Sequence, residues 1–164
     1  MMFAIRKAVL KDFQAIINIM KESTTDEEVR GFVPSEGISP KFLKELKDEL
    51  KRLDHGIIIA EKKGIPVGFA YYTPKNNFVE IEEVDVIKEH QGQGIGRTLI
   101  KHIEKVAKEK GINNLVTGTS INKNGKPWKA YSFWIRIGFT DTGERIQGLH
   151  GLKYVKFVKQ LPKA

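Results

Sequence analysis

Three glycines at alternate positions, Gly92, Gly94 and Gly96, stand directly before a long amphipathic stretch of sequence. Inside a helix or strand a glycine costs roughly 0.5–1 kcal/mol relative to alanine, but it permits positive φ and lets a ligand approach the backbone. The N-terminus of a helix adds unpaired N–H donors and about half a positive charge. This combination predicts a cradle for a phosphate group at the start of a helix.

The spacing of the glycines selects among the common phosphate cradles. A P-loop follows G-x-x-x-x-G-K-[ST], and a dinucleotide fingerprint follows G-x-G-x-x-G. Counted from Gly92, both patterns require glycine at the position that Arg97 occupies. The pattern that the chain does contain is Gln91-x-x-Gly94-x-Gly96. The spacing therefore favours a phosphate cradle of a third kind.

Four carboxylates lie on the segment before the glycines, FVEIEEVDV (78–86), which is predicted to form a β-strand. If the strand has no bulge, alternation places Glu80 and Glu82 on one face, together with the two valines that follow. Glu83 and Asp85 then take the opposite face. Such a strand predicts a locally acidic site within a basic protein, and an acidic site suits the binding of an amine.

Hydrophobic periodicity and turn residues give the order of the elements that position these groups. A strand at 3–9 and a helix beginning near residue 13 come first, and a long loop over 24–39 leads to a helix over 40–53. The remaining elements are strands at 56–61, 66–73 and 78–86, a helix over 94–110, a strand at 115–121, a helix over 128–137, and strands at 139–145 and 152–158. Consecutive strands indicate antiparallel pairs. We predict a single α/β (α+β) domain over residues 1–164, with a mixed, largely antiparallel sheet of about seven strands and about four helices.

Two segments carry a resemblance to a known family. The run Gln91 to Gly96 resembles the [Q/R]-x-x-G-x-[G/A] acetyl-CoA motif of the GNAT superfamily of N-acetyltransferases. The segment AYSFWIRIGF (130–139) resembles the family's second signature, in which an alanine precedes an aromatic pair, a basic residue and Gly-Phe. The predicted order of elements also matches that fold over nearly the whole chain. The resemblance implies a GNAT-like N-acetyltransferase that uses acetyl-CoA as the acyl donor.

The resemblance also implies a set of cofactor contacts. The backbone of Val84, Asp85 and Val86 is expected to pair with pantetheine as another strand would. The glycine segment is expected to hold the pyrophosphate, through Gln91, Gly92, Gln93, Gly94, Ile95, Gly96 and Arg97. Many relatives have asparagine three residues before the motif alanine, where this chain has Pro127. Asn122 or Asn124 is therefore expected to supply a cofactor contact. Trp134 is included because it stands where many relatives have tyrosine.

The implied reaction needs a general base, because a lysine-type amine has a pKa near ~10.4 and is protonated at neutral pH. A base contributes roughly 10²–10⁴-fold in rate, and in this family it often lies on the strand before the glycines. By position we favour Glu82, followed by Glu80 and Glu83. Many relatives also use a tyrosine to protonate the leaving thiolate. Trp134 takes that position and is not a practical acid, so Tyr131, one turn earlier, is the nearest substitute.

Composition limits the other functions. The chain has 164 residues, no cysteine and a formal net charge of +8. The four histidines show no metal-ligand spacing, and no apolar run reaches the ~18–20 residues that span a bilayer. No signal peptide is evident, so we predict a cytoplasmic protein. Nucleic acid is a less favoured partner than an amine acceptor, whether small molecule or protein amine. The family resemblance also suggests a homodimer, and the alternative function is a non-catalytic module that binds CoA or acyl-CoA.

Overall fold

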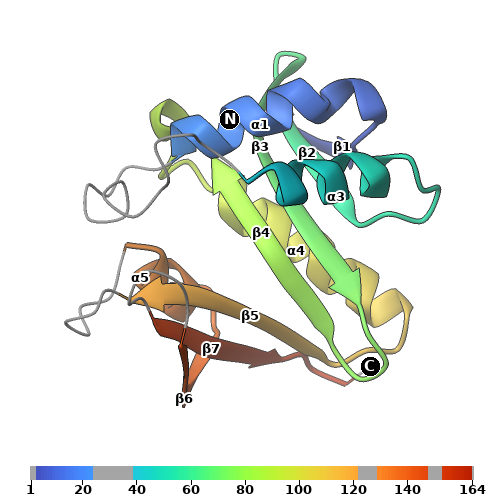
Figure 1. Cartoon of the computed structure of the whole chain (residues 1–164). Helices are drawn as coiled ribbons and strands as arrows, with labels where there is room; N and C mark the ends of the chain where they lie inside the picture. The colour runs from blue at the N-terminus through green and yellow to red at the C-terminus, as the bar shows by residue number, and fades with distance from the viewer. Residues whose placement is uncertain (1–2, 24–38, 122–128, 148–152, 164) are drawn as a thin grey trace.

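Seven β-strands form one sheet in the computed structural model of the chain, which describes residues 3–23, 39–121, 129–147 and 153–163 (Figure 1). The order across the sheet is β1-β2-β3-β4-β5-β7-β6. The only parallel pair in this sheet is β4 with β5; every other neighbouring pair is antiparallel. The strands are β1 (Ala4–Lys7), β2 (Ile57–Lys62), β3 (Ile65–Pro74), β4 (Val79–Val86), β5 (Asn114–Ile121), β6 (Thr140–Gln147) and β7 (Lys153–Gln160).

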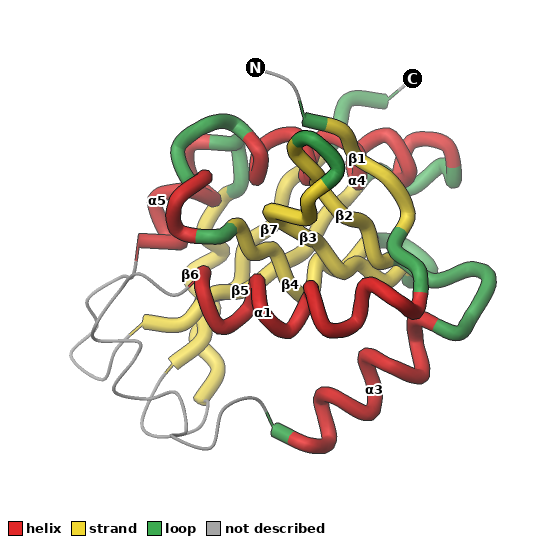
Figure 2. Tube along the Cα trace, turned by 90° about the horizontal axis from the view of Figure 1, so that it is seen from above, coloured by secondary structure: helices red, strands yellow, loops and turns green. Residues whose placement is uncertain are grey.

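Helices cover both faces of the sheet. Figure 2 shows α1 and α3 on one side of the strands and α4 on the other. The described residues form four α-helices, namely α1 (Phe13–Ser23), α3 (Pro40–Leu50), α4 (Ile95–Glu109) and α5 (Lys129–Arg136). Short 3₁₀ turns lie at Leu10–Asp12 and Lys88–His90. The start of α3 is fixed locally, because the Ser39 side chain accepts a hydrogen bond from the backbone N–H of Phe42, and proline follows the cap.

The hydrophobic core has two layers, one on each face of the sheet. Strand β2 shows how they divide: Ile57 and Ile59 pack with α1 and α3, whereas Ile58 and Ala60 pack with α4. A strand buried on both faces reads as a continuous apolar run, which is why this segment has no polar alternation. We call the two layers the α1/α3 layer and the α4 layer.

The predicted architecture is confirmed: a mixed α/β sheet of seven strands with four helices. Most element boundaries agree with the sequence prediction within about three residues, the range expected for frayed ends. The predicted loop over 24–39 falls almost entirely outside the described residues. Among the helices of the described part, none is long and apolar enough to cross a membrane. The same part of the chain contains no group of three side chains placed to hold a metal ion.

Candidate active site

Strand β4 contains a β-bulge at Glu82. Opposite it, Tyr71 of β3 pairs with Glu83, but the next residue, Tyr72, pairs with Ile81. Glu82 is therefore the extra residue of β4, and it interrupts the alternation of side chains. On either side of it, Ile81 and Val84 both contact the α4 layer.

The bulge brings all four carboxylates to the face of β4 that carries the α1/α3 layer. Glu83 lies opposite Tyr71 and Asp85 lies opposite Phe69, and both aromatic residues belong to that layer. Glu82 accepts a hydrogen bond from Thr73, which alternates with Tyr72 onto the same side as Tyr71, so Glu82 lies on that side too. Burial together with the charge of Glu82 raises the pKa of Tyr71 to about 12. The predicted face shared by Glu80, Glu82 and the following valines required a strand without a bulge, and that condition is not met. A bulge shifts the pleat by one residue.

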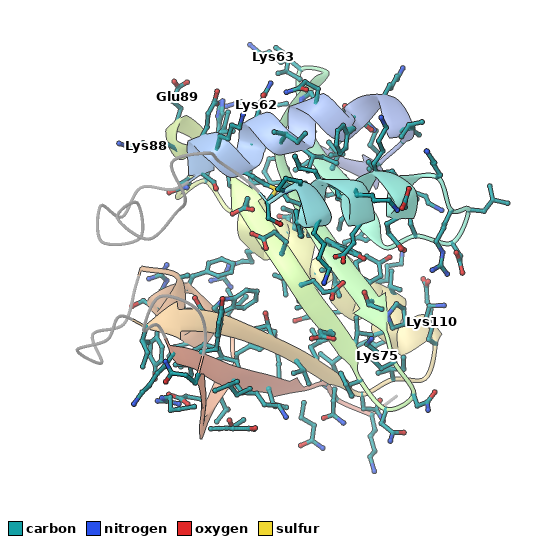
Figure 3. All side chains as sticks on the ribbon, in the orientation of Figure 1. Lys62, Lys63, Lys75, Lys88, Glu89 and Lys110 are labelled. Atoms are coloured by element: carbon teal, nitrogen blue, oxygen red, sulfur yellow. The ribbon has the colours of Figure 1, made fainter. Side chains whose placement is uncertain are left out.

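The two outer carboxylates have partners near the surface. Thr73 Oγ1 donates a 2.6 Å hydrogen bond to Glu82 Oε2, and the Glu82 side chain is exposed. Glu80 pairs with Thr73 across the strands, and its carboxylate lies 4.0 Å from Lys75 Nζ, at the start of β4 (Figure 3). Surface ion pairs of this kind contribute little. Both side chains are therefore open to solvent and to a bound molecule.

The two inner carboxylates, Glu83 and Asp85, lie on one face of β4, close enough for each to shift the pKa of the other. Burial, the charge of Asp85 and the hydrogen bond to it raise the pKa of Glu83 well above its usual range. Burial also raises the pKa of Asp85, although hydrogen bonds from Glu83 and Ser23 oppose this. Asp85 Oδ1 lies 3.0 Å from Ser23 Oγ, whereas Asp85 Oδ2 is buried without an N–H or hydroxyl donor from the described residues.

Strands β4 and β5 separate soon after they begin. Only Val79 and Glu80 of β4 pair with β5, opposite Leu115 and Val116, and Figure 1 shows the two ribbons diverging from there. The last link is a 3.0 Å hydrogen bond from Thr117 Oγ1 to the Ile81 carbonyl. Beyond it, the β5-facing edge of β4 has no strand beside it among the described residues. Such an edge can bind an extended chain through backbone hydrogen bonds.

The glycine segment lies between the end of β4 and the start of α4. Gly92 and Gly94 have φ of 77° and 86°, and a Cβ added to either would meet nothing within 4 Å. The first backbone hydrogen bond of α4 runs from Thr98 N to the Gly94 carbonyl, at 3.0 Å. The N–H groups before Thr98 therefore have no acceptor within the helix. Open space, left-handed glycines and unpaired donors fit a phosphate group.

Gly96 serves a different purpose from the other two glycines. A Cβ at this position would lie 3.1 Å from Phe133 Cζ, so the missing side chain lets α5 pack against the first turn of α4. Arg97, the next residue, is exposed. Gln93 is half-buried, and its Oε1 atom has no hydrogen-bond partner among the residues that the structure describes. The three glycines thus divide into two for backbone conformation and one for helix packing.

Three other candidate residues have the following places. Trp134 is 6% exposed and packs edge-to-face against Phe133 and Phe139 in the core. Tyr131 donates a 2.7 Å hydrogen bond to Asp141 Oδ2, and this bond is the main reason that its pKa is raised. Both observations disfavour chemistry at these side chains. Asn122, like Asn124, lies outside the described residues.

Sequence reasoning missed Ser23 and Thr73, whose hydroxyls contact Asp85 and Glu82. Ser23 lies 62 residues from Asp85 in the sequence. No local pattern marks it, because a single serine at the end of a helix is ordinary. Thr73 is nine residues from Glu82, and a predicted hairpin would have brought the two strands together without fixing this contact.

The site combines an open strand edge, a glycine-rich helix start and carboxylates on the adjoining face. This combination fits an acyltransferase that binds an acyl-CoA donor. The model of the acetyltransferase (GNAT) family matches residues 14–133. The chain belongs to the GNAT family of acetyltransferases, enzymes that use acetyl-CoA.

Relatives and solved structures agree with this assignment. The 5-NmdU N-acetyltransferase of Pseudomonas phage PaMx11 is 25% identical over 149 residues, which are 90% of this chain and 94% of the phage protein. The structure of Ard1 from Thermoplasma volcanium has a TM-score of 0.78 at 14% identity, covering 98% of this chain and 99% of that one. The structure of PaiA N-acetyltransferase from Thermoplasma acidophilum, in complex with coenzyme A, has a TM-score of 0.69 at 20% identity. The match covers 98% of this chain and 99% of that one. These two structures show that the fold is shared.

Proposed function

We propose that this acetyltransferase transfers the acetyl group from acetyl-CoA to a primary amine by direct attack, with a carboxylate of β4 as the general base. Bound acetyl-CoA supplies an acetyl group that is already activated as a thioester. The observation that carries the proposal is the bulge at Glu82, which gathers four carboxylates on one face of β4. An amine bound at this face can be held as a cation and can then give up its proton to one of them.

Glu83 is the carboxylate that best suits the role of base. A general base works best when its pKa lies near the operating pH. Burial and the neighbouring Asp85 move the pKa of Glu83 in that direction. Glu82, the first choice from position alone, is exposed and accepts a hydrogen bond from Thr73. Glu83 also follows the bulge directly, where β4 has just separated from β5.

The cofactor contacts proposed for this chain use backbone groups. The N–H groups of Gly92 to Arg97 would hold the pyrophosphate, aided by the positive end of the α4 dipole. The edge of β4 at Val84 and Asp85 would pair with pantetheine. The Val86 carbonyl already accepts a 2.8 Å hydrogen bond from Gln91 Nε2. It therefore contributes less to cofactor binding than the family resemblance implied.

The acceptor is proposed to be a primary amine, on a small molecule or on a protein. The carboxylates of β4 favour a cationic acceptor locally, although the chain as a whole carries a net charge of +8. The cytoplasmic location and the homodimer remain predictions from the sequence and from the family resemblance.

The test measures free thiol released from acetyl-CoA with a panel of amines. The panel contains alkyl monoamines, peptides with a free N-terminus or a lysine, and 5-NmdU, after the name of the phage relative. We expect release to depend on one class of amine and Glu83→Gln to slow it by roughly 10²–10⁴-fold, with Asp48→Asn on the exposed face of α3 as the control. Tight CoA binding without thiol release for any amine would instead favour the non-catalytic alternative. Full activity of Glu83→Gln would remove Glu83 as the base.

A further inference from the structure

The side chain of Gln91, the first residue of the glycine motif, contacts the protein rather than open space. Its Nε2 atom donates to the Ser23 carbonyl at 3.0 Å and to the Val86 carbonyl at 2.8 Å. A glutamine amide has two N–H groups. Both are therefore used in these contacts, and neither remains to donate to a phosphate.

The two carbonyls belong to the ends of two elements. Ser23 is the last described residue of α1. Val86 is the last residue of β4. The following residue, Ile87, donates its N–H to the Val67 carbonyl at 2.9 Å. Gln91 thus joins the end of α1 to the end of β4 at the point where the chain turns toward the glycines.

Ser23 carries a second link to the same strand. Its hydroxyl lies 3.0 Å from Asp85 Oδ1, and Asp85 shares a face of β4 with Glu83. A short series of contacts therefore runs from Gln91 through Ser23 to the carboxylate pair of β4. In the sequence, the carboxylate pair comes before the end of β4 and the glycine segment comes after it. Ser23 contacts Asp85 of the pair and Gln91 at the start of the glycine motif.

We infer that Gln91 is a positioning residue, which acts through the Ser23 and Val86 carbonyls to hold the glycine segment in register with the carboxylate strand. The two N–H groups of the Gln91 amide perform this role. Gln91→Met keeps the length of the side chain and removes both donors, whereas Gln91→Arg keeps N–H donors. Gln14→Met on the exposed face of α1 is the matched control for the same substitution elsewhere.

The decisive experiment compares acetyl-CoA with S-acetylpantetheine, which has the thioester and pantetheine but no pyrophosphate. We expect Gln91→Met to lower kcat/KM about tenfold for both donors, as the loss of two hydrogen bonds suggests, and Gln91→Arg to restore most of it. A loss confined to acetyl-CoA would overturn the inference, because the end of β4 and its carboxylates, which act on both donors, would then be unaffected by the loss of the Gln91 contacts. The inference would also be overturned if Gln91→Arg failed to restore kcat/KM, or if Gln91→Met left kcat/KM unchanged.

A second measurement needs neither the acetyl donor nor the amine acceptor. Amide hydrogen exchange of the ligand-free protein should show faster exchange of the Ile87 N–H in Gln91→Met and a return toward the native rate in Gln91→Arg. Unchanged exchange in Gln91→Met would contradict the inference. Because this measurement does not use an amine, it separates a failure of the Gln91 inference from a wrong acceptor or a wrong base.

Discussion

Thr73 Oγ1 donates a 2.6 Å hydrogen bond to Glu82 Oε2 beside the position where β4 holds one residue more than β3. This contact fixes the extra residue with its carboxylate toward the α1/α3 layer. Because the pleat shifts there, Glu83 and Asp85 follow on the same face instead of alternating with Glu82. One inserted residue thus turns a strand with carboxylates on both faces into a strand with a single acidic face.

Replacing Glu83 with glutamine should stabilise the fold while it slows catalysis. An unfolded glutamate has a pKa near ~4.3, and the folded pKa of Glu83 is raised by burial and by Asp85. The folded state therefore binds the proton more tightly than the unfolded state does. The free energy of unfolding falls as the pH rises from the unfolded pKa toward the folded pKa. At pH 7.5 we expect Glu83→Gln to raise Tm, by about 2–4 °C for each kcal/mol that the substitution adds to the free energy of unfolding. At pH 4 the gain should nearly vanish, and a lower Tm at pH 7.5 would contradict this account.

Replacing Asp85 with asparagine should move the acid side of the pH–rate profile to lower pH. The charge of Asp85, and the hydrogen bond that Glu83 makes with it, both help to raise the pKa of Glu83. Asparagine removes the charge and can still accept from Ser23, so Glu83 should lose its proton at lower pH. The measurement is kcat/KM as a function of pH. A profile that stays in place, with Asp48→Asn as the reference, would mean that Glu83 does not set the acid side.

Gly94→Val should abolish tight CoA binding. Gly94 has φ of 86°, where a side chain costs roughly 1–2 kcal/mol, and the valine would occupy the open space before α4. Gly64→Val is the matched control, because Gly64 has φ of 77° and is equally open, but lies in the turn between β2 and β3. Thermal unfolding should show similar losses for both variants. Calorimetry should show at least about a tenfold loss of CoA affinity for Gly94→Val alone, and equal affinities would show that the glycine segment does not hold the cofactor.

Tyr131→Phe should have a small effect on turnover. The Tyr131 hydroxyl donates to Asp141, which also accepts two hydrogen bonds from Arg145. Because the bond to Asp141 raises the pKa of Tyr131, the hydroxyl is a poorer acid. We expect kcat within about threefold of the native value and a loss of about 1 kcal/mol in the free energy of unfolding. A hundredfold lower kcat with unchanged unfolding would instead assign Tyr131 the role of general acid.

The glycine segment was predictable because its signals are local. Left-handed backbone at Gly92 and Gly94 follows from the residue type, and α4 follows from apolar residues at helical spacing. The exclusion of two nucleotide motifs needed only the identity of Arg97. The order of strands and helices was also recoverable, because each element has its own periodicity. The purpose of Gly96 was not, since Phe133 lies on another helix.

The carboxylate face was decided by tertiary structure. Nothing in the sequence VEIEEVDV marks Glu82 as the extra residue. A bulge is a mismatch in residue number between two paired strands, so its position also depends on β3. The valines of β4 must reach the α4 layer on both sides of the bulge, and burial of apolar surface enforces this register. The sequence by itself determined the fold, the family and the glycine-rich start of α4, because their signals lie within short stretches of sequence. The tertiary structure alone decided which carboxylates meet and what Gln91 holds, because those contacts join segments up to 68 residues apart.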